Sequence, residues 1–97
     1  MKITKQWNEK GCVFEIEGRI DTLTSGELEE AVNEVCDNCD KLVLDMTGVD
    51  YVSSAGIRVI IQAHQTLGKE NFSLKNVPGN VMELFKMTGF QKVLNFE

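Results

Sequence analysis

The spacing of apolar and polar positions changes several times along the chain, and each change predicts a new element. Residues 12–17 alternate cleanly between the two kinds, which is typical of a half-buried strand, and Gly18 is expected to close it. Residues 2–7 form a second, weaker strand candidate. The polar, glycine-containing segment between the two suits a hairpin loop.

Three other stretches carry apolar residues three and four positions apart, the period of an amphipathic helix. They cover residues 25–38, residues 54–67, and a segment that opens at Pro78-Gly79-Asn80. Thr24 and Glu27 are placed to form a capping box at the start of the first helix. The second helix is apolar almost all round and leaves one polar stripe, made of Ser54, Arg58, Gln62 and Gln65.

Short apolar runs between these helices predict the remaining strands. Residues 41–46 have the composition of a strand buried on both faces, and residues 45–50 are expected to turn the chain at Gly48. A strand is also expected at residues 72–76, and a last one at 93–96. The order is therefore β-β-α-β-α-β-α with a possible final β, an α/β fold in which helices pack on a mixed β-sheet.

Length and charge limit the classes of function. Ninety-seven residues leave room for one small domain, and the net charge of −5 disfavours nucleic acid as the main ligand. The N-terminus lacks the apolar core of a signal peptide, and no apolar run approaches the ~20 residues of a membrane span. We therefore expect a cytoplasmic protein without direct membrane insertion.

No constellation of residues typical of an enzyme is present. The single histidine, His64, falls inside the second predicted helix, where a partly buried structural role is favoured over that of a base. The sequence contains no glycine-rich phosphate loop, either of the G-x-x-x-x-G-K type or of the G-x-G-x-x-G type. Asp21, Asp45 and Asp50 are interpreted as strand-end and turn residues and not as metal ligands. We expect no catalytic activity, no metal and no cofactor.

The three cysteines leave one alternative open. Cys36 and Cys39 have the C-x-x-C spacing of a redox pair, but they fall at the end of a predicted helix and not at its start, where the dipole would lower a thiol pKa. No second pair completes a zinc site. Buried or incidental cysteines are favoured, and a thiol redox protein remains the alternative.

The segment from Val49 to Ile61 carries the clearest functional signal. A short apolar run ends in Ser53 and Ser54, and a strongly apolar helix follows at once. A serine at this position lies beside backbone N–H groups that have no intrahelical acceptor, and the helix start favours negative charge. One serine can therefore cap the helix while a phosphate on the other is tolerated.

These residues resemble the STAS domain, and among its members the free-standing anti-sigma factor antagonists of bacteria. The resemblance is carried by Gly18-Arg19-Ile20-Asp21, by the strand Leu42–Met46, and above all by the serine segment Val49–Ile57. It covers nearly the whole chain in order and spacing. Residues 1–97 are therefore expected to form a single STAS domain with a STAS-like mixed sheet.

The resemblance implies a partner-switching function. The unphosphorylated antagonist binds an anti-sigma factor that is also a serine kinase, which releases a sigma factor, and a PP2C-type phosphatase restores the active form after phosphorylation. It places the phosphorylated serine at Ser54 and a neighbouring loop aspartate at Asp21. With Ser53 and Arg58 these residues form the expected partner-binding surface of a monomer or weak dimer.

Two positions depart from the pattern common in the family. Ser53 stands where an acidic residue is frequent, and Ala55 where a second hydroxyl is frequent. STAS subunits that are not phosphorylated, including partners of lipid-transport ATPases, have a similar helix start. A constitutive subunit of a membrane-transport complex is therefore a second alternative.

Overall fold

The chain folds as one four-stranded mixed sheet with helices. The computed structural model describes residues 1–97, and the sheet has the order β1-β2-β3-β4. β1 and β2 are antiparallel, while β2, β3 and β4 run parallel. The elements are β1 (Lys2–Trp7), β2 (Cys12–Ile20), α1 (Ser25–Cys36), β3 (Leu42–Val52), α2 (Ser54–Leu67), β4 (Phe72–Lys75), α3 (Gly79–Thr88) and the 3₁₀ turn η1 (Phe90–Lys92). The expected α/β architecture is confirmed.

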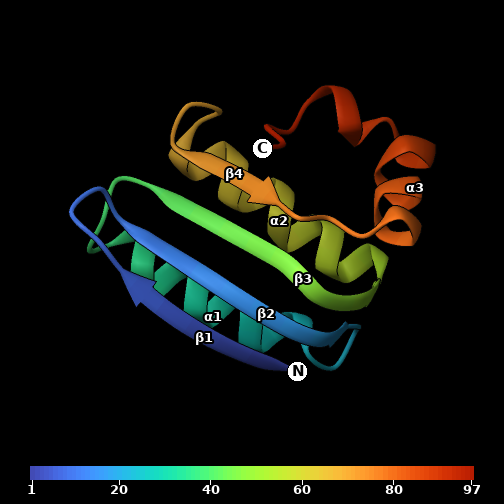
Figure 1. Ribbon diagram of the computed structural model, residues 1–97, viewed down its shortest axis with the longest axis horizontal. Helices are drawn as coiled ribbons and strands as arrows, with labels where there is room; N and C mark the ends of the chain where they lie inside the picture. The colour runs from blue at the N-terminus through green and yellow to red at the C-terminus, as the bar shows by residue number, and fades with distance from the viewer.

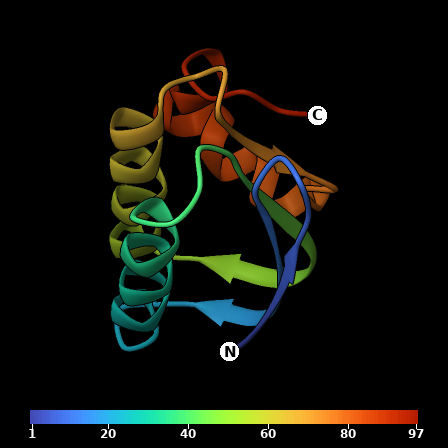
Figure 2. The same ribbon diagram turned by 90° about the vertical axis from the view of Figure 1, so that its left-hand side faces the viewer.

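The helices cover the sheet unequally. α1 and α2 lie side by side against one face (Figures 1 and 2), and a core of 21 buried hydrophobic residues joins them, together with α3 and the C-terminal segment, to the sheet. On the opposite face Val43 and Asp45 of β3 are only partly buried. The expectation that this strand is buried on both faces is therefore wrong, because its second face has no such covering layer.

β3 is a single strand of 11 residues and not a short strand followed by a turn. Its register against β2 shifts twice, between Glu15 and Glu17 and between Gly18 and Arg19. The shifts put Met46, Val49 and Val52 into the core at intervals of three residues. A regular strand that covers a core buries every second residue on one face. Because residues 46–52 do not follow this period, the sequence pattern predicts a turn over residues 45–50 where the strand in fact continues.

β2 likewise continues beyond its predicted end at Gly18 and stops at Ile20. Gly18 lies inside the strand with φ of +100°, next to a register shift. Gly48 allows the two strands to approach there, because a Cβ on it would lie 3.1 Å from the carbonyl oxygen of Ile16. Both glycines thus lie within paired strands, whereas the sequence pattern predicts a strand end at Gly18 and a turn at Gly48.

The ends of the other elements differ in detail from prediction. α2 has the predicted bounds, α1 ends two residues early at Cys36, and β4 ends one residue early at Lys75. The expected C-terminal strand is reduced to one bridge, between Leu74 and Phe96.

The predicted capping box is absent. Thr24 is the N-cap residue of α1, but its backbone is helical and its side chain caps no helix amide. The hydroxyl instead accepts from the Asp21 N–H at 2.8 Å and donates to the Arg19 carbonyl at 2.8 Å. The Thr24 side chain therefore closes the turn after β2, and Glu27 is bonded to Thr24 only through the backbone, where its N–H donates to the Thr24 carbonyl at 3.0 Å.

Candidate functional site

The two serines at the start of α2 have different environments. Ser53 is the N-cap, and its Oγ accepts from the Gly56 N–H at 3.2 Å. It is 8% exposed, and its own N–H donates to the Ile20 carbonyl at 2.7 Å. Ser53 is therefore a buried structural residue, and the expectation that one of the serines caps the helix is confirmed.

Ser54 is the first residue of α2 and is exposed. Its N–H and that of Ala55 belong to the first helical turn, where no intrahelical acceptor exists, so the local field favours an anion. Arg58 lies one turn further along the helix, is exposed and forms no ion pair. The Ser54 hydroxyl is thus an accessible group beside unpaired N–H donors and a free guanidinium.

Asp21 lies in the loop that joins β2 to α1, which we call the Asp21 loop (residues 21–24). Its Oδ1 accepts from the N–H groups of Leu23 at 3.0 Å and Thr24 at 2.9 Å. The bond from the Thr24 backbone is the main reason why the pKa of Asp21 lies below its ordinary value. Arg19 adds to this shift, with its Nε 4.0 Å from Oδ2.

The Asp21 loop and the start of α2 are fixed to each other by close backbone packing. Besides the hydrogen bond from Ser53 to Ile20, a Cβ on Gly56 would lie 2.6 Å from Ile20 Cγ2 and 3.1 Å from the Ile20 carbonyl oxygen. Only glycine permits this approach without a shift. The structure thus places Asp21, Ser53, Ser54 and Arg58 at one end of the sheet, where β2 and β3 end and α2 begins.

Sequence reasoning missed several residues at this end of the molecule. Leu23, in the Asp21 loop, is 89% exposed. The Arg19 guanidinium lies 4.4 Å from the centre of the Tyr51 ring, a cation–π contact. Asn80 of α3 donates to the Asp50 carbonyl at 2.9 Å. An apolar residue between polar neighbours could have identified Leu23, whereas the Arg19–Tyr51 pair depends on the register shift between β2 and β3.

A groove of about 440 Å³ runs along the polar stripe of α2. It begins at Ser54 and Arg58 and is closed on its other side by Thr88 and Phe90, from the end of α3 and from η1. Ile57 and Ile61 give it a partly apolar lining. The exposed serine therefore opens onto a concave surface and not onto a flat one.

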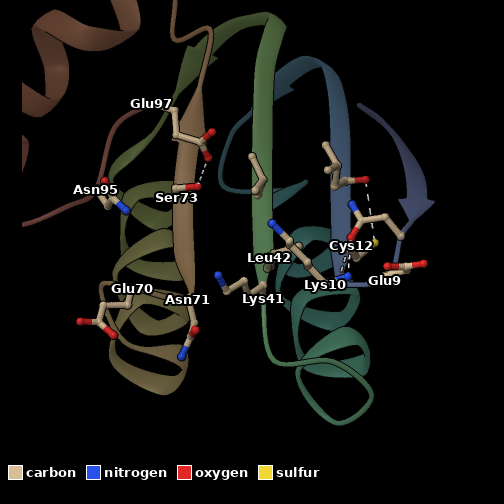
Figure 3. Close-up of a pocket in the computed structure, with 14 residues that line it drawn as sticks. Glu9, Lys10, Cys12, Lys41, Leu42, Glu70, Asn71, Ser73, Asn95 and Glu97 are labelled. Carbon is tan, nitrogen blue, oxygen red and sulfur yellow. Dashed lines mark hydrogen bonds between the residues drawn. The ribbon is translucent and has the colours of Figure 1, made fainter.

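A larger hollow, of about 580 Å³, lies at the other end of the strands (Figure 3). Its asparagines already hold the surrounding loops: Asn71 donates to the Leu67 carbonyl, and Asn95 donates to the Lys69 carbonyl. The side chains of Lys10 and Lys41 stand beside them. No group of three or more His, Cys, Asp or Glu side chains here or elsewhere is placed to hold a metal ion.

The cysteines lie away from the serines, and all three are free thiols. Cys36 is the last residue of α1, and Cys39 follows in the loop, where its Sγ donates to the Lys41 carbonyl at 3.2 Å. Burial raises the pKa of Cys12, Cys36 and Cys39. A reactive redox thiol requires a lowered pKa, so the raised pKa of these thiols does not favour the thiol redox alternative.

The family model described as the STAS domain matches residues 2–97. The chain belongs to the STAS domain family. None of the helices of this STAS protein is both long and apolar enough to cross a membrane.

Two relatives of this STAS protein are named for an action on anti-sigma factors. The anti-sigma-F factor antagonist RsfB of Mycobacterium tuberculosis is 36% identical over 59 residues, which cover 60% of this chain and 48% of RsfB, so the match spans about half of that relative's length. The putative anti-sigma factor antagonist BtrV of Bordetella bronchiseptica is 28% identical over 98 residues, which cover 96% of this chain and 83% of BtrV.

Solved structures show the same fold. An anti-sigma factor antagonist from Mycobacterium paratuberculosis superimposes with a TM-score of 0.87 at 26% identity, covering 98% of this chain and 83% of that one. The unphosphorylated form of the anti-sigma factor antagonist SpoIIAA gives a TM-score of 0.81 at 11% identity, with coverage of 99% and 88%. The second likeness is one of fold alone.

Proposed function

We propose that residues 1–97 act as a single STAS domain and as a cytoplasmic anti-sigma factor antagonist that is switched by phosphorylation of Ser54. In the unmodified form it binds an anti-sigma factor that is also a serine kinase, and the sigma factor is released. The kinase then phosphorylates Ser54, and a PP2C-type phosphatase reverses the modification. The binding surface is formed by Asp21, Ser53, Ser54 and Arg58. Ser53 is buried and supports this surface by capping α2.

The observation that carries this proposal is the division of roles between the two serines. Ser53 is buried and its hydroxyl is occupied by the Gly56 N–H, whereas Ser54 is exposed at the helix start. A kinase can therefore reach Ser54 without unfolding the helix. The N–H groups of the first turn and Arg58 offer charge-assisted hydrogen bonds to a phosphate. The names of the relatives supply the class of partner.

Phosphorylation in vitro tests the acceptor. We expect incubation with the cognate anti-sigma serine kinase and ATP to label one peptide, and mass spectrometry to locate the phosphate on Ser54. The Ser54→Ala protein should take up no label. Ser53→Ala is the matched control: it removes the cap but leaves the acceptor, so it should still be labelled. Label that persists in Ser54→Ala would contradict the assignment.

A further inference from the structure

Leu23 is the most exposed large hydrophobic residue of the protein, at 89%, ahead of Met87 at 79%. A single exposed leucine is ordinary on a protein surface. Leu23 differs because its backbone is held in place: its N–H donates to Asp21 Oδ1, and the next N–H, from Thr24, donates to the same oxygen. The side chain is therefore presented on a fixed loop.

The Asp21 loop is also continuous with the Ser54 surface. It begins directly after Ile20, whose carbonyl accepts from the Ser53 N–H and whose side chain packs against Gly56. These contacts fix the end of β2, from which the loop starts, to the start of α2, and the bonds to Asp21 Oδ1 order the loop itself. A protein that covers Ser54 therefore meets Leu23 in a fixed position relative to the hydroxyl.

We propose that Leu23 is the apolar anchor of the interface with the anti-sigma factor, and that Asp21 is a positioning residue that holds Leu23 in place. The role of Leu23 rests on the proposed function, because the anti-sigma factor is the partner that receives it. Its side chain enters an apolar pocket of that partner next to the contact with Ser54. An anchor that is ordered before binding loses little conformational entropy in the complex, so its burial contributes to affinity with little offset.

A membrane is a poorer occupant for this loop. Attachment to an anionic lipid surface needs clustered basic residues, whereas the chain carries a net charge of −5. Arg19, two residues before the loop, is engaged by Asp21 and by the Tyr51 ring. A single leucine on a rigid loop with neutralised charge fits a protein pocket better than a bilayer.

The first test is the affinity of Leu23→Ala for the anti-sigma factor, measured by calorimetry with each purified anti-sigma serine kinase of the source organism. Loss of a buried leucine side chain from an interface predicts binding weaker by about 10- to 100-fold. Thr22→Ala is the matched control, because Thr22 is the exposed neighbour in the same loop and its side chain makes no hydrogen bond. Its affinity should stay within about twofold of the wild type.

The second test separates positioning by Asp21 from direct recognition of its charge. An asparagine at position 21 retains an oxygen that accepts from the Leu23 and Thr24 N–H groups, whereas an alanine does not. Asp21→Asn should therefore lose less affinity than Asp21→Ala, whose loss should lie in the range of that of Leu23→Ala. Amide hydrogen exchange at Leu23 and Thr24 should rise in Asp21→Ala only.

Each remaining outcome overturns a defined statement. If the wild-type protein binds a kinase and Leu23→Ala binds it equally well, Leu23 is not the anchor and the proposed function survives. If Asp21→Asn loses as much as Asp21→Ala, the partner reads the carboxylate directly and the positioning role is wrong. Self-association or vesicle binding that disappears in Leu23→Ala would assign the residue to a different contact. A wild-type protein that binds none of the kinases would remove the proposed function itself.

Discussion

At the scale of single residues, Ser53 and Ser54 differ in environment and not in chemistry. A phosphate on Ser53 would have to break the bond to Gly56 and enter a site that is 8% exposed. A dianion in such a site lacks solvation and lacks room. On Ser54 the same group stays in water and faces the unpaired N–H groups of the first turn. The fold therefore selects one of two adjacent hydroxyls.

Asp21 makes stability depend on pH in a predictable direction. Hydrogen bonds, first of all from the Thr24 backbone, lower its pKa in the folded protein. A carboxylate with a depressed folded pKa stabilises the fold at pH values above its unfolded pKa, and this contribution is lost as the pH falls through the folded pKa. We expect an NMR titration to give Asp21 a midpoint below that of an unfolded peptide. We also expect Asp21→Asn to lose less stability than the wild type on acidification.

Asp50→Asn provides the control for this pH dependence. Asp50 is exposed, its side chain makes no hydrogen bond, and its backbone carbonyl accepts from Asn80. Its replacement should leave the acid-induced loss of stability as it is in the wild type. Equal acid sensitivity of Asp21→Asn and the wild type in urea titrations at several pH values would show that the Asp21 bonds do not stabilise the fold.

At the scale of elements, the contact between β2 and the start of α2 depends on Gly56. A Cβ there would lie 2.6 Å from the Ile20 side chain and 3.1 Å from the Ile20 carbonyl oxygen. Gly56→Ala should therefore destabilise the protein by about 1–3 kcal/mol in urea denaturation, even though alanine favours helix. The backbone oxygen is the decisive neighbour, because it cannot move aside as a flexible side chain can.

Gly26→Ala is the matched control within another helix. Gly26 lies in α1, and a Cβ on it meets nothing within 4 Å. The same substitution should stabilise the protein there by about 0.5–1 kcal/mol through helix propensity alone. A loss of stability in Gly56→Ala together with a gain in Gly26→Ala would show that the close approach to Ile20, and not backbone entropy, decides the effect at Gly56. A Gly56→Ala protein more stable than the wild type would contradict the tight contact.

Helices were easier to predict than strands for a physical reason. α2 is apolar on most sides and has a regular period, a cap at Ser53 and a terminating Gly68, so local signals sufficed. β3 owes its continuity to pairing with β2, and two register shifts gave it an irregular burial pattern. Strand pairing lies between segments distant in sequence, and no local periodicity records where a register changes.

The residues of the candidate site also differ in how far the sequence predicts them. The position of Ser54 could be predicted from the local signals of the helix start, whereas Asp21 was assigned to the site only through the resemblance to the STAS domain. The contact of Arg19 with Tyr51 arises only once β2 and β3 are in register. The failed capping box has a similar cause: the Thr24 hydroxyl is used by the backbone of Arg19 and Asp21 at the end of β2.

At the scale of the whole molecule, the strands of the sheet connect two ends that carry different groups of residues. β3 runs from Leu42, at the larger hollow with Lys10 and Lys41, to Val52, directly before the serines (Figures 1 and 3). The cysteines and the asparagine-held loops belong to the first end. The partner surface proposed at the Ser54 end is therefore separate from the loops of the other end, and a modification there is expected to leave the core and those loops unchanged.

Phosphorylation should consequently alter binding and not folding. A phosphate adds about −1.5 to −2 charges at the start of α2, where the helix dipole and Arg58 compensate it in the free protein. A partner surface built around a neutral Ser54 and closed over the Asp21 loop must desolvate that charge, at a cost of roughly 2–5 kcal/mol. Affinity for the anti-sigma factor should fall about 30- to 5,000-fold, while the melting temperature changes little.

Calorimetry and thermal melts on the same preparation of phosphorylated protein decide between the two effects. Ser54→Asp should reproduce part of the loss of affinity, because its single charge is smaller than that of the phosphate. Arg58→Ala should lower the melting temperature of the phosphorylated form more than that of the unmodified form, since it removes the compensating cation only where there is charge to compensate. If phosphorylation unfolds the domain, or leaves the affinity unchanged, a charge placed on the surface is not how this protein changes partners.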